Sequence, residues 1–295
     1  MIPMAQGKRI ILVGDHRQLP HIVDDEVARQ MEEGEAGEEE SEWLKKSMFQ
    51  YLFSERLKAL EQKDKWPRRV TLEKQYRMHP LLGDFISRNF YERFDPSEKF
   101  GSVRPESDFV HNLPDTENKP AIWLDVPAAI GKHQRSGTSW TRPAEAAAIA
   151  RQLQAWMNSK EGESLSFGVI SFYKAQAELI KKHLGKITDD GRRLRIGTVD
   201  SFQGMEFDVV FLSMVRTMRQ NWKPRTDEAE KQARSLFGHL CLYNRLNVSM
   251  SRQKRLLAVA GDSELLQNDL AAEFIPGLVD FFNLCRTEGR VLPCR

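Results

Sequence analysis

Short apolar runs alternate along the chain with stretches in which apolar residues recur at helical spacing. The apolar runs predict buried strands, and the 3.6-residue periodicity predicts helices that face a core. The predicted strands cover residues 8–14, 121–124, 167–170, 195–199, 209–214 and 256–260. The predicted helices cover residues 44–60, 81–91, 143–157 and 174–184. Strands that alternate with helices predict an α/β fold with a doubly wound parallel sheet.

Polar residues directly follow four of the predicted strands. Asp15-His16-Arg17-Gln18 follows the first strand, and Ser171-Phe172-Tyr173 follows the run at 167–170. Residues 200–204 and Gly261-Asp262 follow two further runs. Ligands of doubly wound sheets bind beyond the carboxyl ends of the strands. We therefore expect these polar residues to gather at one rim of the sheet.

Proline and charge divide the chain into three predicted parts. The first helical pattern ends near Leu60, and Pro67 breaks the polar segment that follows. We predict a first domain over residues 1–66, a second over 67–265 and a tail over 266–295. Glutamates interleaved with glycines between residues 32 and 42 predict a solvated acidic loop within the first part.

Composition narrows the class of protein. A chain of 295 residues with 40% hydrophobic residues can bury a sizeable core, and the net charge of +2 restricts any nucleic-acid surface to a local patch. Three scattered cysteines form neither a disulfide framework nor a CxxC zinc pattern. No apolar run reaches the roughly 20 residues that span a bilayer, and no signal-peptide core begins the chain. We expect a cytoplasmic or nucleoid-associated protein that is not secreted and has no membrane partner.

Five stretches, in this order and spacing, resemble the C-terminal motifs of superfamily 1 helicases, in the group of the nonsense-mediated-decay helicases. They are GDHRQLP (14–20), QYRMHP (75–80), GVISFYKAQ (168–176), TVDSFQGMEFD (198–208) and NRLNVSMSRQK (244–254). The resemblance implies a complete second RecA-like domain preceded by a partial first one. In that family, two RecA-like domains close on ATP and ratchet along a single strand of nucleic acid.

The resemblance also implies an ATP site. Gln18, whose amide both donates and accepts, would touch the terminal phosphate and the attacking water. Arg77 and Arg252 would reach the γ-phosphate, where guanidinium groups offset developing charge. Tyr76 would pack against the nucleotide base or sugar. Glu206 would contact the ribose or the arginines.

Glycine and neighbouring polar residues would shape the loop before Glu206. Gly204 permits close backbone approach to the nucleotide, while Asp200 and Gln203 help to fix the loop. A half-buried tyrosine, a surface arginine or a turn amide is the ordinary alternative for each of these residue types taken alone. The intact motifs favour the catalytic interpretation of Gln18, Arg77 and Arg252.

Hydroxyl-bearing turns are the candidates for nucleic-acid contact. Ser171, Tyr173, Thr198 and Ser201 could bind the phosphate backbone without reading sequence. A solvated face is favoured over a phosphate track for the basic set Lys181, Lys182, Lys186, Arg192, Arg193 and Arg195. His16, His21 and His79 lack a metal-ligand arrangement, so we predict structural roles for them and no protein-bound metal.

Two motifs that a helicase motor requires do not occur in this sequence. No GK pair ends in Ser or Thr within a phosphate-binding loop, and no acidic pair stands in the order needed for Mg²⁺. We therefore expect ATP with Mg²⁺ as the cofactor, with the Mg²⁺ ligands outside this chain. The missing motifs would lie upstream of Met1 or in a separate P-loop chain, and this chain alone would hydrolyse ATP weakly or not at all.

Three functions remain open at this point. The chain could be the C-terminal part of an ATP-dependent helicase or translocase acting on single-stranded DNA or RNA. It could instead be a non-catalytic remnant that binds nucleic acid or a partner. A regulatory domain that responds to bound nucleotide would use the same residues without turnover.

Overall fold

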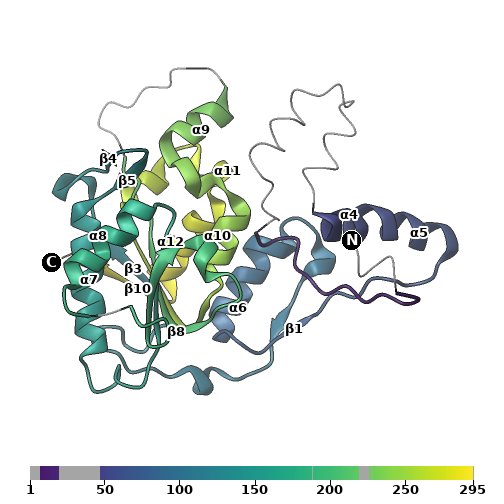
Figure 1. The fold of residues 1–295 in the computed structure, drawn as a ribbon, viewed down its shortest axis with the longest axis horizontal. Coiled ribbons are helices and arrows are strands. Elements are labelled where there is room, and N and C mark those ends of the chain that lie inside the picture. The colour runs from purple at the N-terminus through teal and green to yellow at the C-terminus, as the bar shows by residue number, and fades with distance from the viewer. Residues whose placement is uncertain (1–6, 20–46, 188, 219–225, 227, 295) are drawn as a thin grey trace. The chain divides into compact units, whose positions relative to one another are not determined.

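A six-stranded parallel sheet forms the centre of the larger of two structural units (Figure 1). This computed structural model describes residues 7–19, 47–187, 189–218, 226 and 228–294. The chain divides into a first unit, Met1–Thr71, and a second unit, Leu72–Arg295. His21 and the acidic stretch 32–42 lie outside the described residues.

The sheet of the second unit has the strand order β10-β3-β9-β8-β6-β7, and all its neighbours pair in parallel. Ser171 at the end of β6 pairs with both Thr198 and Ser213, so three strands end at one level. The predicted α/β class is confirmed, and the sheet is consistent with a RecA-like domain. The strands are β3 (Ala121–Asp125), β6 (Phe167–Ser171), β7 (Leu194–Thr198), β8 (Phe207–Ser213), β9 (Gln253–Gly261) and β10 (Arg290–Pro293).

Helices cover both faces of the sheet because successive side chains of a strand point to opposite faces. Ile122 and Leu124 of β3 pack in one core with α7 (Pro143–Met157) and α8 (Lys174–Leu184). Trp123, between them, contacts Phe282 of α12 (Pro276–Thr287) with ring centroids 5.0 Å apart. The helices α7 and α8 follow the sequence prediction, with Pro143 in the first helical turn.

Shorter elements complete the second unit. Its other α-helices are α6 (Pro80–Ser87), α9 (Ala229–Phe237), α10 (Tyr243–Met250) and α11 (Ala271–Phe274). Its π-helix and 3-10 helices are η2 (Arg88–Glu92), η3 (Pro96–Glu98), η4 (Glu106–Phe109), η5 (Ala128–Ile130), η6 (Val199–Phe202), η7 (Gly238–Cys241) and η8 (Ser263–Gln267). Its two small sheets pair β1 (Lys74–Gln75) with β2 (Gly101–Ser102), and β4 (Gln134–Ser136) with β5 (Ser139–Thr141).

The C-terminal residues are part of the second unit, so the prediction of a tail over 266–295 was wrong. β10 pairs with β3 at the edge of the sheet, and Phe281 of α12 contacts Phe85 of α6 at 5.4 Å. β10 has only four residues and one buried side chain, Leu292, which is too little pattern to mark a strand in the sequence. β10 is a strand because its backbone pairs with β3, and its own residues do not form a recognisable strand pattern.

Helical structure in the first unit runs from residue 48 to residue 64. It consists of α4 (Met48–Tyr51), the π-helix η1 (Leu52–Arg56) and α5 (Leu57–Asp64). Lys65 ends it with a left-handed φ of 63°. Arg69 then turns back, and its guanidinium pairs with Glu61 at 2.9 Å.

The predicted strand over residues 8–14 is not a strand in this structure. Ile11 and Val13 are 91% and 87% exposed, and the described residues 7–14 do not pair with any strand. An apolar run becomes a strand only when a neighbouring strand accepts its backbone hydrogen bonds. None of the helices in the described part of the chain combines the length and apolarity that crossing a bilayer requires.

A buried ion pair lies within the start of α7, and its carboxylate bonds to the end of β8. Arg142 and Glu145 are both fully buried, with their side chains 3.2 Å apart. Glu145 also accepts hydrogen bonds from Ser213 Oγ (2.5 Å) and from the Val215 backbone N–H (2.9 Å). Burial raises the pKa of Glu145, and Arg142 opposes that shift. Val215 has a φ of 66°, a left-handed conformation that is costly for a β-branched residue.

We predict that His111 makes the second unit sensitive to acid. Its Nδ1 accepts from the Leu113 N–H (3.2 Å) and its Nε2 lies 3.2 Å from Lys119 O, an arrangement that suits the neutral ring. Burial lowers its pKa from 6.5 to about 4. Because the unfolded chain binds the proton first, this stability is present above pH 6.5 and is lost as the pH falls toward 4.

The measurement is denaturant unfolding at pH 7.5 and at pH 5. His111 should account for about 2 kcal/mol of the stability lost between these two values. His111→Gln, which cannot be protonated, should therefore lose less stability than the wild type over the same interval. Equal losses in the two proteins would show that His111 is not responsible.

Candidate nucleotide-binding site

One glutamine side chain shapes the loop that precedes α6. Gln75 Oε1 accepts hydrogen bonds from the backbone N–H groups of Arg77 (2.9 Å) and Met78 (2.7 Å). Its Nε2 donates to Met78 O (2.8 Å) and to Ser102 Oγ. His79 then caps α6, because its Nδ1 accepts from Leu81 N at 3.2 Å. These bonds fix the backbone from which Tyr76 and Arg77 project.

Two cations share the carboxylate of Glu206. Arg77 Nε donates to Glu206 Oε2 at 2.8 Å, and Lys254 Nζ lies 2.9 Å from Glu206 Oε1. Lys254, and then Arg77, lower the pKa of Glu206, so it is a carboxylate at neutral pH. All three side chains are partly exposed. The cluster therefore carries one net positive charge at a surface that an anion can approach.

Tyr76 directly precedes Arg77 in this loop and presents an aromatic ring to solvent. Its side chain is 59% exposed, although large aromatic residues are usually buried. Gly204, two residues before Glu206, has a φ of 76° and open space at its Cβ position. Only glycine adopts that conformation without strain. The structure thus brings Arg77 and Glu206 together, with Tyr76 next to Arg77 in the chain and Gly204 two residues before Glu206.

Arg252 is close to this cluster but is directed inward. It is 2% exposed, and its guanidinium donates to Val248 O (3.2 Å) and to Ser251 Oγ (3.0 Å). Arg77 Nη1 donates to Ser251 O at 3.4 Å, so both arginines meet at Ser251. In this conformation Arg77 reaches the surface and Arg252 does not.

The cluster lies at the amino ends of the strands, opposite to the carboxyl rim at which we expected the polar residues that follow the strands. Glu206 and Arg252 directly precede β8 and β9, whose first residues, Phe207 and Gln253, pair with each other. Ser171 and Thr198 lie at the opposite, carboxyl edge. The polar residues after β6, β7 and β9 do follow the carboxyl ends of those strands, as expected. Glu206 lies at the opposite edge because the segment after β7 returns through η6 to the start of β8. The motif at residues 198–208 therefore both follows β7 and precedes β8.

The hydroxyls proposed for nucleic-acid contact differ in exposure. Ser171 and Tyr173 are buried, and Ser171 Oγ accepts from the Tyr173 N–H at 3.2 Å. Tyr173 OH accepts from the His239 N–H at 3.4 Å, and burial raises the pKa of Tyr173. Neither hydroxyl is presented to solvent, because the turn uses both internally. Thr198 and Ser201 are half-buried, and Ser201 Oγ donates to Thr198 O at 2.7 Å.

Gln18 lies in the first unit, within a turn that Asp15 organises. Asp15 Oδ1 accepts from the Arg17 N–H at 2.9 Å, and Asp15 Oδ2 accepts from Gln18 Nε2 at 2.7 Å. The amide of Gln18 is therefore oriented by its own turn.

Sequence reasoning missed Lys254, Gln75 and Ser251. All three lie in or beside the motifs, and Lys254 stands only two residues from Arg252. Their roles depend on partners distant in sequence, which no local pattern reveals. Asp200 forms a further long-range pair with Arg245 of α10 at 3.2 Å, which ties the segment after β7 to that helix.

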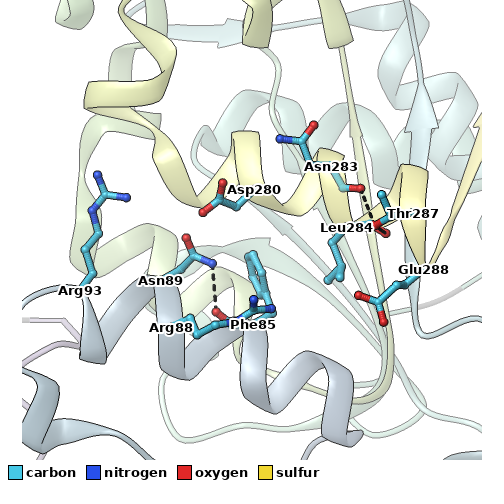
Figure 2. Close-up of a pocket in the computed structure, with 9 residues that line it drawn as sticks. All are labelled: Phe85, Arg88, Asn89, Arg93, Asp280, Asn283, Leu284, Thr287 and Glu288. Atoms are coloured by element: carbon cyan, nitrogen blue, oxygen red, sulfur yellow. Dashed lines mark hydrogen bonds between the residues drawn. The ribbon is translucent and has the colours of Figure 1, made fainter.

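A polar groove of about 350 Å³ lies elsewhere in the second unit, between α12 and the helical segment α6–η2 (Figure 2). Arg88 and Arg93 come from one wall, and Asp280 and Glu288 come from α12 and its C-terminal end. None of the predicted site residues lines it. Within the described residues, no three His, Cys, Asp or Glu side chains come together as a set of metal ligands.

A family model described as "AAA domain" matches residues 44–264. The chain belongs to this AAA domain family. Its relatives place it in the superfamily 1 helicase group that the motifs resemble, which confirms that interpretation of the sequence.

Two relatives illustrate the likeness. The regulator of nonsense transcripts 1 homolog of Neurospora crassa is 30% identical over 274 residues, which cover 90% of this chain and 21% of the relative. The ATP-dependent helicase NAM7 of Saccharomyces cerevisiae is 29% identical over 311 residues, 98% of this chain and 27% of the relative. This AAA-family chain thus spans about a fifth to a quarter of the relatives that it matches.

A solved structure, the C-terminal domain of a possible DNA helicase from Lactobacillus plantarum WCFS1, is also similar to this family member. The two chains are 17% identical with a TM-score of 0.34. The match covers 68% of this chain and 94% of the other.

We predict that Gly83→Ala disrupts the loop of Arg77 although alanine is the better helix former. A Cβ at Gly83 would stand 2.5 Å from Ser102 Oγ and 2.6 Å from Gln75 Nε2. Gln75 would have to shift and release the Arg77 and Met78 N–H groups. Thermal unfolding should show destabilisation instead of the gain of roughly 1 kcal/mol expected at an unconstrained helical site.

Gly101→Ala is the matched control, because its Cβ meets no atom within 4 Å. The double variant Gly83→Ala/Ser102→Gly should regain part of the lost stability by removing one of the two contacts. If Gly83→Ala were as stable as Gly101→Ala, the hydrogen bonds of Gln75 to the Arg77 and Met78 N–H groups would not be needed to hold the loop before α6.

Proposed function

We propose that this chain supplies the second-domain wall of an ATP site, and part of the single-strand track, in an ATP-driven nucleic-acid motor. The observation that carries the proposal is the contact of Arg77 and Lys254 with Glu206 at the amino ends of β8 and β9, with the exposed Tyr76 next to Arg77 in the chain. An exposed aromatic ring beside exposed cations suits a nucleotide, which has a flat base and a charged phosphate tail.

Arg77 is the best candidate for direct phosphate contact. Its guanidinium is partly exposed, permanently charged and held by Glu206 through a single nitrogen, Nε. An incoming γ-phosphate could accept from the remaining N–H groups while Glu206 keeps the side chain oriented. Arginines in this role contribute roughly 10³- to 10⁵-fold to phosphoryl transfer.

Arg252 has a different relation to the phosphate. Its guanidinium would have to leave Val248 O and Ser251 Oγ before it touched a nucleotide. Because Arg77 also bonds to Ser251, a phosphate that draws on Arg77 would disturb the same residue. We therefore assign the direct contact to Arg77, and to Arg252 a contact that requires rearrangement.

The rest of the ATP site would come from a P-loop domain, either in a longer polypeptide or in a separate chain. That domain would bring the phosphate-binding loop and the acidic pair that holds Mg²⁺, which neutralises phosphate charge when bound. Gln18 would orient the attacking water. Thr198 and Ser201, at the carboxyl edge, would contact single-stranded DNA or RNA.

The test fuses this chain in frame behind a P-loop domain from an ATP-dependent helicase relative. We expect ATP hydrolysis that single-stranded nucleic acid stimulates, and a loss of about 10³-fold or more in Arg77→Ala. Arg88→Ala is the matched control, because Arg88 is an exposed arginine that directly follows α6, the helix that the Arg77 loop precedes. Co-operative thermal unfolding of the fusion verifies assembly.

Other outcomes would favour the other functions. Strand binding by an assembled fusion without hydrolysis would favour the non-catalytic remnant. Micromolar ATP affinity of the isolated chain, without turnover by the fusion, would favour a regulatory nucleotide sensor. Equal ATPase rates in Arg77→Ala and Arg88→Ala would remove Arg77 from the catalytic site.

A further inference from the structure

The β4–β5 hairpin is a basic and aromatic projection from the second unit. Between residues 126 and 144 the sequence has no Asp or Glu, and it includes Lys132, Arg135 and Trp140. Lys132 and Arg135 are exposed, and neither forms an ion pair with any described residue. The hairpin therefore presents two cations that no carboxylate among the described residues neutralises, within a protein whose net charge is close to zero.

Trp140 contacts the exposed Arg135 and the buried Arg216. The Arg135 guanidinium is 4.6 Å from its ring centroid, and the Arg216 guanidinium is 5.0 Å from it. The His133 ring packs edge-on at 5.1 Å. Arg216 is buried and donates to Leu236 O (2.9 Å) and to Ser235 O, so it is a fixed support. Arg135 is exposed and can move.

Several contacts hold the hairpin rigidly at the carboxyl edge of the sheet. Ser139 Oγ accepts from the Ala175 N–H at 3.4 Å, which ties β5 to the first turn of α8. His133 Nδ1 accepts from the Thr217 N–H at 3.1 Å and lies 2.8 Å from Thr217 Oγ1. The hairpin thus lies at the edge where β6 and β7 end, beside α8 (Figure 1).

We infer that this hairpin is a contact site for single-stranded nucleic acid. Lys132 and Arg135 bind backbone phosphates, and a base stacks on the part of Trp140 that Arg135 uncovers when it turns to a phosphate. Cations interleaved with an aromatic platform are the combination by which proteins bind single strands without reading sequence. The site extends the track proposed at Thr198 and Ser201, and it rests on the proposed function.

An acidic protein surface would satisfy the two cations but would leave the half-exposed Trp140 without a flat partner. A nucleic-acid strand satisfies both, because its phosphates and bases alternate along the chain. We therefore assign the hairpin to nucleic acid and treat displacement by an acidic polypeptide as the opposing outcome.

The test measures binding of a fluorescent single-stranded oligonucleotide to the full chain, without nucleotide, over a range of salt concentrations. Lys132→Ala/Arg135→Ala should weaken binding about tenfold or more and lower the salt slope by about 1.4, or 0.7 for each lost phosphate contact. The control Lys160→Ala/Arg286→Ala removes the same charge from two exposed positions at the ends of α7 and α12. Slopes that are equal in the two double variants would overturn the inference.

A second variant tests the stacking. Trp140→Leu should abolish the fluorescence change of a 2-aminopurine base in the strand, and Trp140→Tyr should restore part of it. Unfolding curves exclude loss of fold, and the charge variant decides the outcome if Trp140→Leu does not fold. Polyglutamate that displaced the strand at equal charge concentration would overturn the nucleic-acid assignment.

The outcomes also separate this inference from the function on which it rests. If the wild-type chain and the fusion both fail to bind single strands, the proposed track fails as a whole. If they bind strands and the hairpin variants match their controls, only the hairpin site fails. The ATPase test of Arg77 is independent of both results.

Discussion

The buried pair of Arg142 and Glu145 is the constraint on which the carboxyl edge of the second unit depends. A charged group without water needs both an opposite charge and hydrogen bonds, and removing one partner of such a pair typically costs about 3–5 kcal/mol. Here Arg142 supplies the charge, while Ser213 Oγ and the Val215 N–H supply hydrogen bonds to Glu145. The start of α7 and the end of β8 are thereby held together.

The path of the chain after β8 follows from this pair. Glu145 accepts a hydrogen bond from the Val215 N–H, and the left-handed conformation of Val215 redirects the chain that leads on to Arg216 and Thr217. Arg216 then supports Trp140, and Thr217 anchors His133. A buried electrostatic requirement thus fixes the base of an exposed basic hairpin. The ion pair itself has a structural role, and the hairpin that it positions is the part that could bind a ligand.

The opposite edge of the sheet is organised by partly exposed charges. Glu206 orders Arg77 and Lys254, and Gln75 holds the loop that presents Arg77. Because these groups retain access to solvent, a phosphate could compete for them without the desolvation that a buried pair would require. The sheet therefore separates two polar edges, and we propose that one binds a nucleotide and the other a nucleic-acid strand. Strands β8 and β9 connect them through a buried core.

The sequence by itself determined the local elements and the residue types of the site. Periodic patterns predicted α7, α8 and β6 within a residue or two, because each buries a continuous apolar face. The motifs pointed to Arg77 and Glu206, which the structure brings into contact. Only the tertiary structure decided that residues 8–14 form no ladder, that β10 joins the sheet, that Tyr173 is buried and that Lys254 pairs with Glu206. The physical reason is that hydrophobic periodicity shows only which face of a helix or strand is buried. Strand pairing, the burial of a side chain and an ion pair each also require a partner residue that is distant in the sequence.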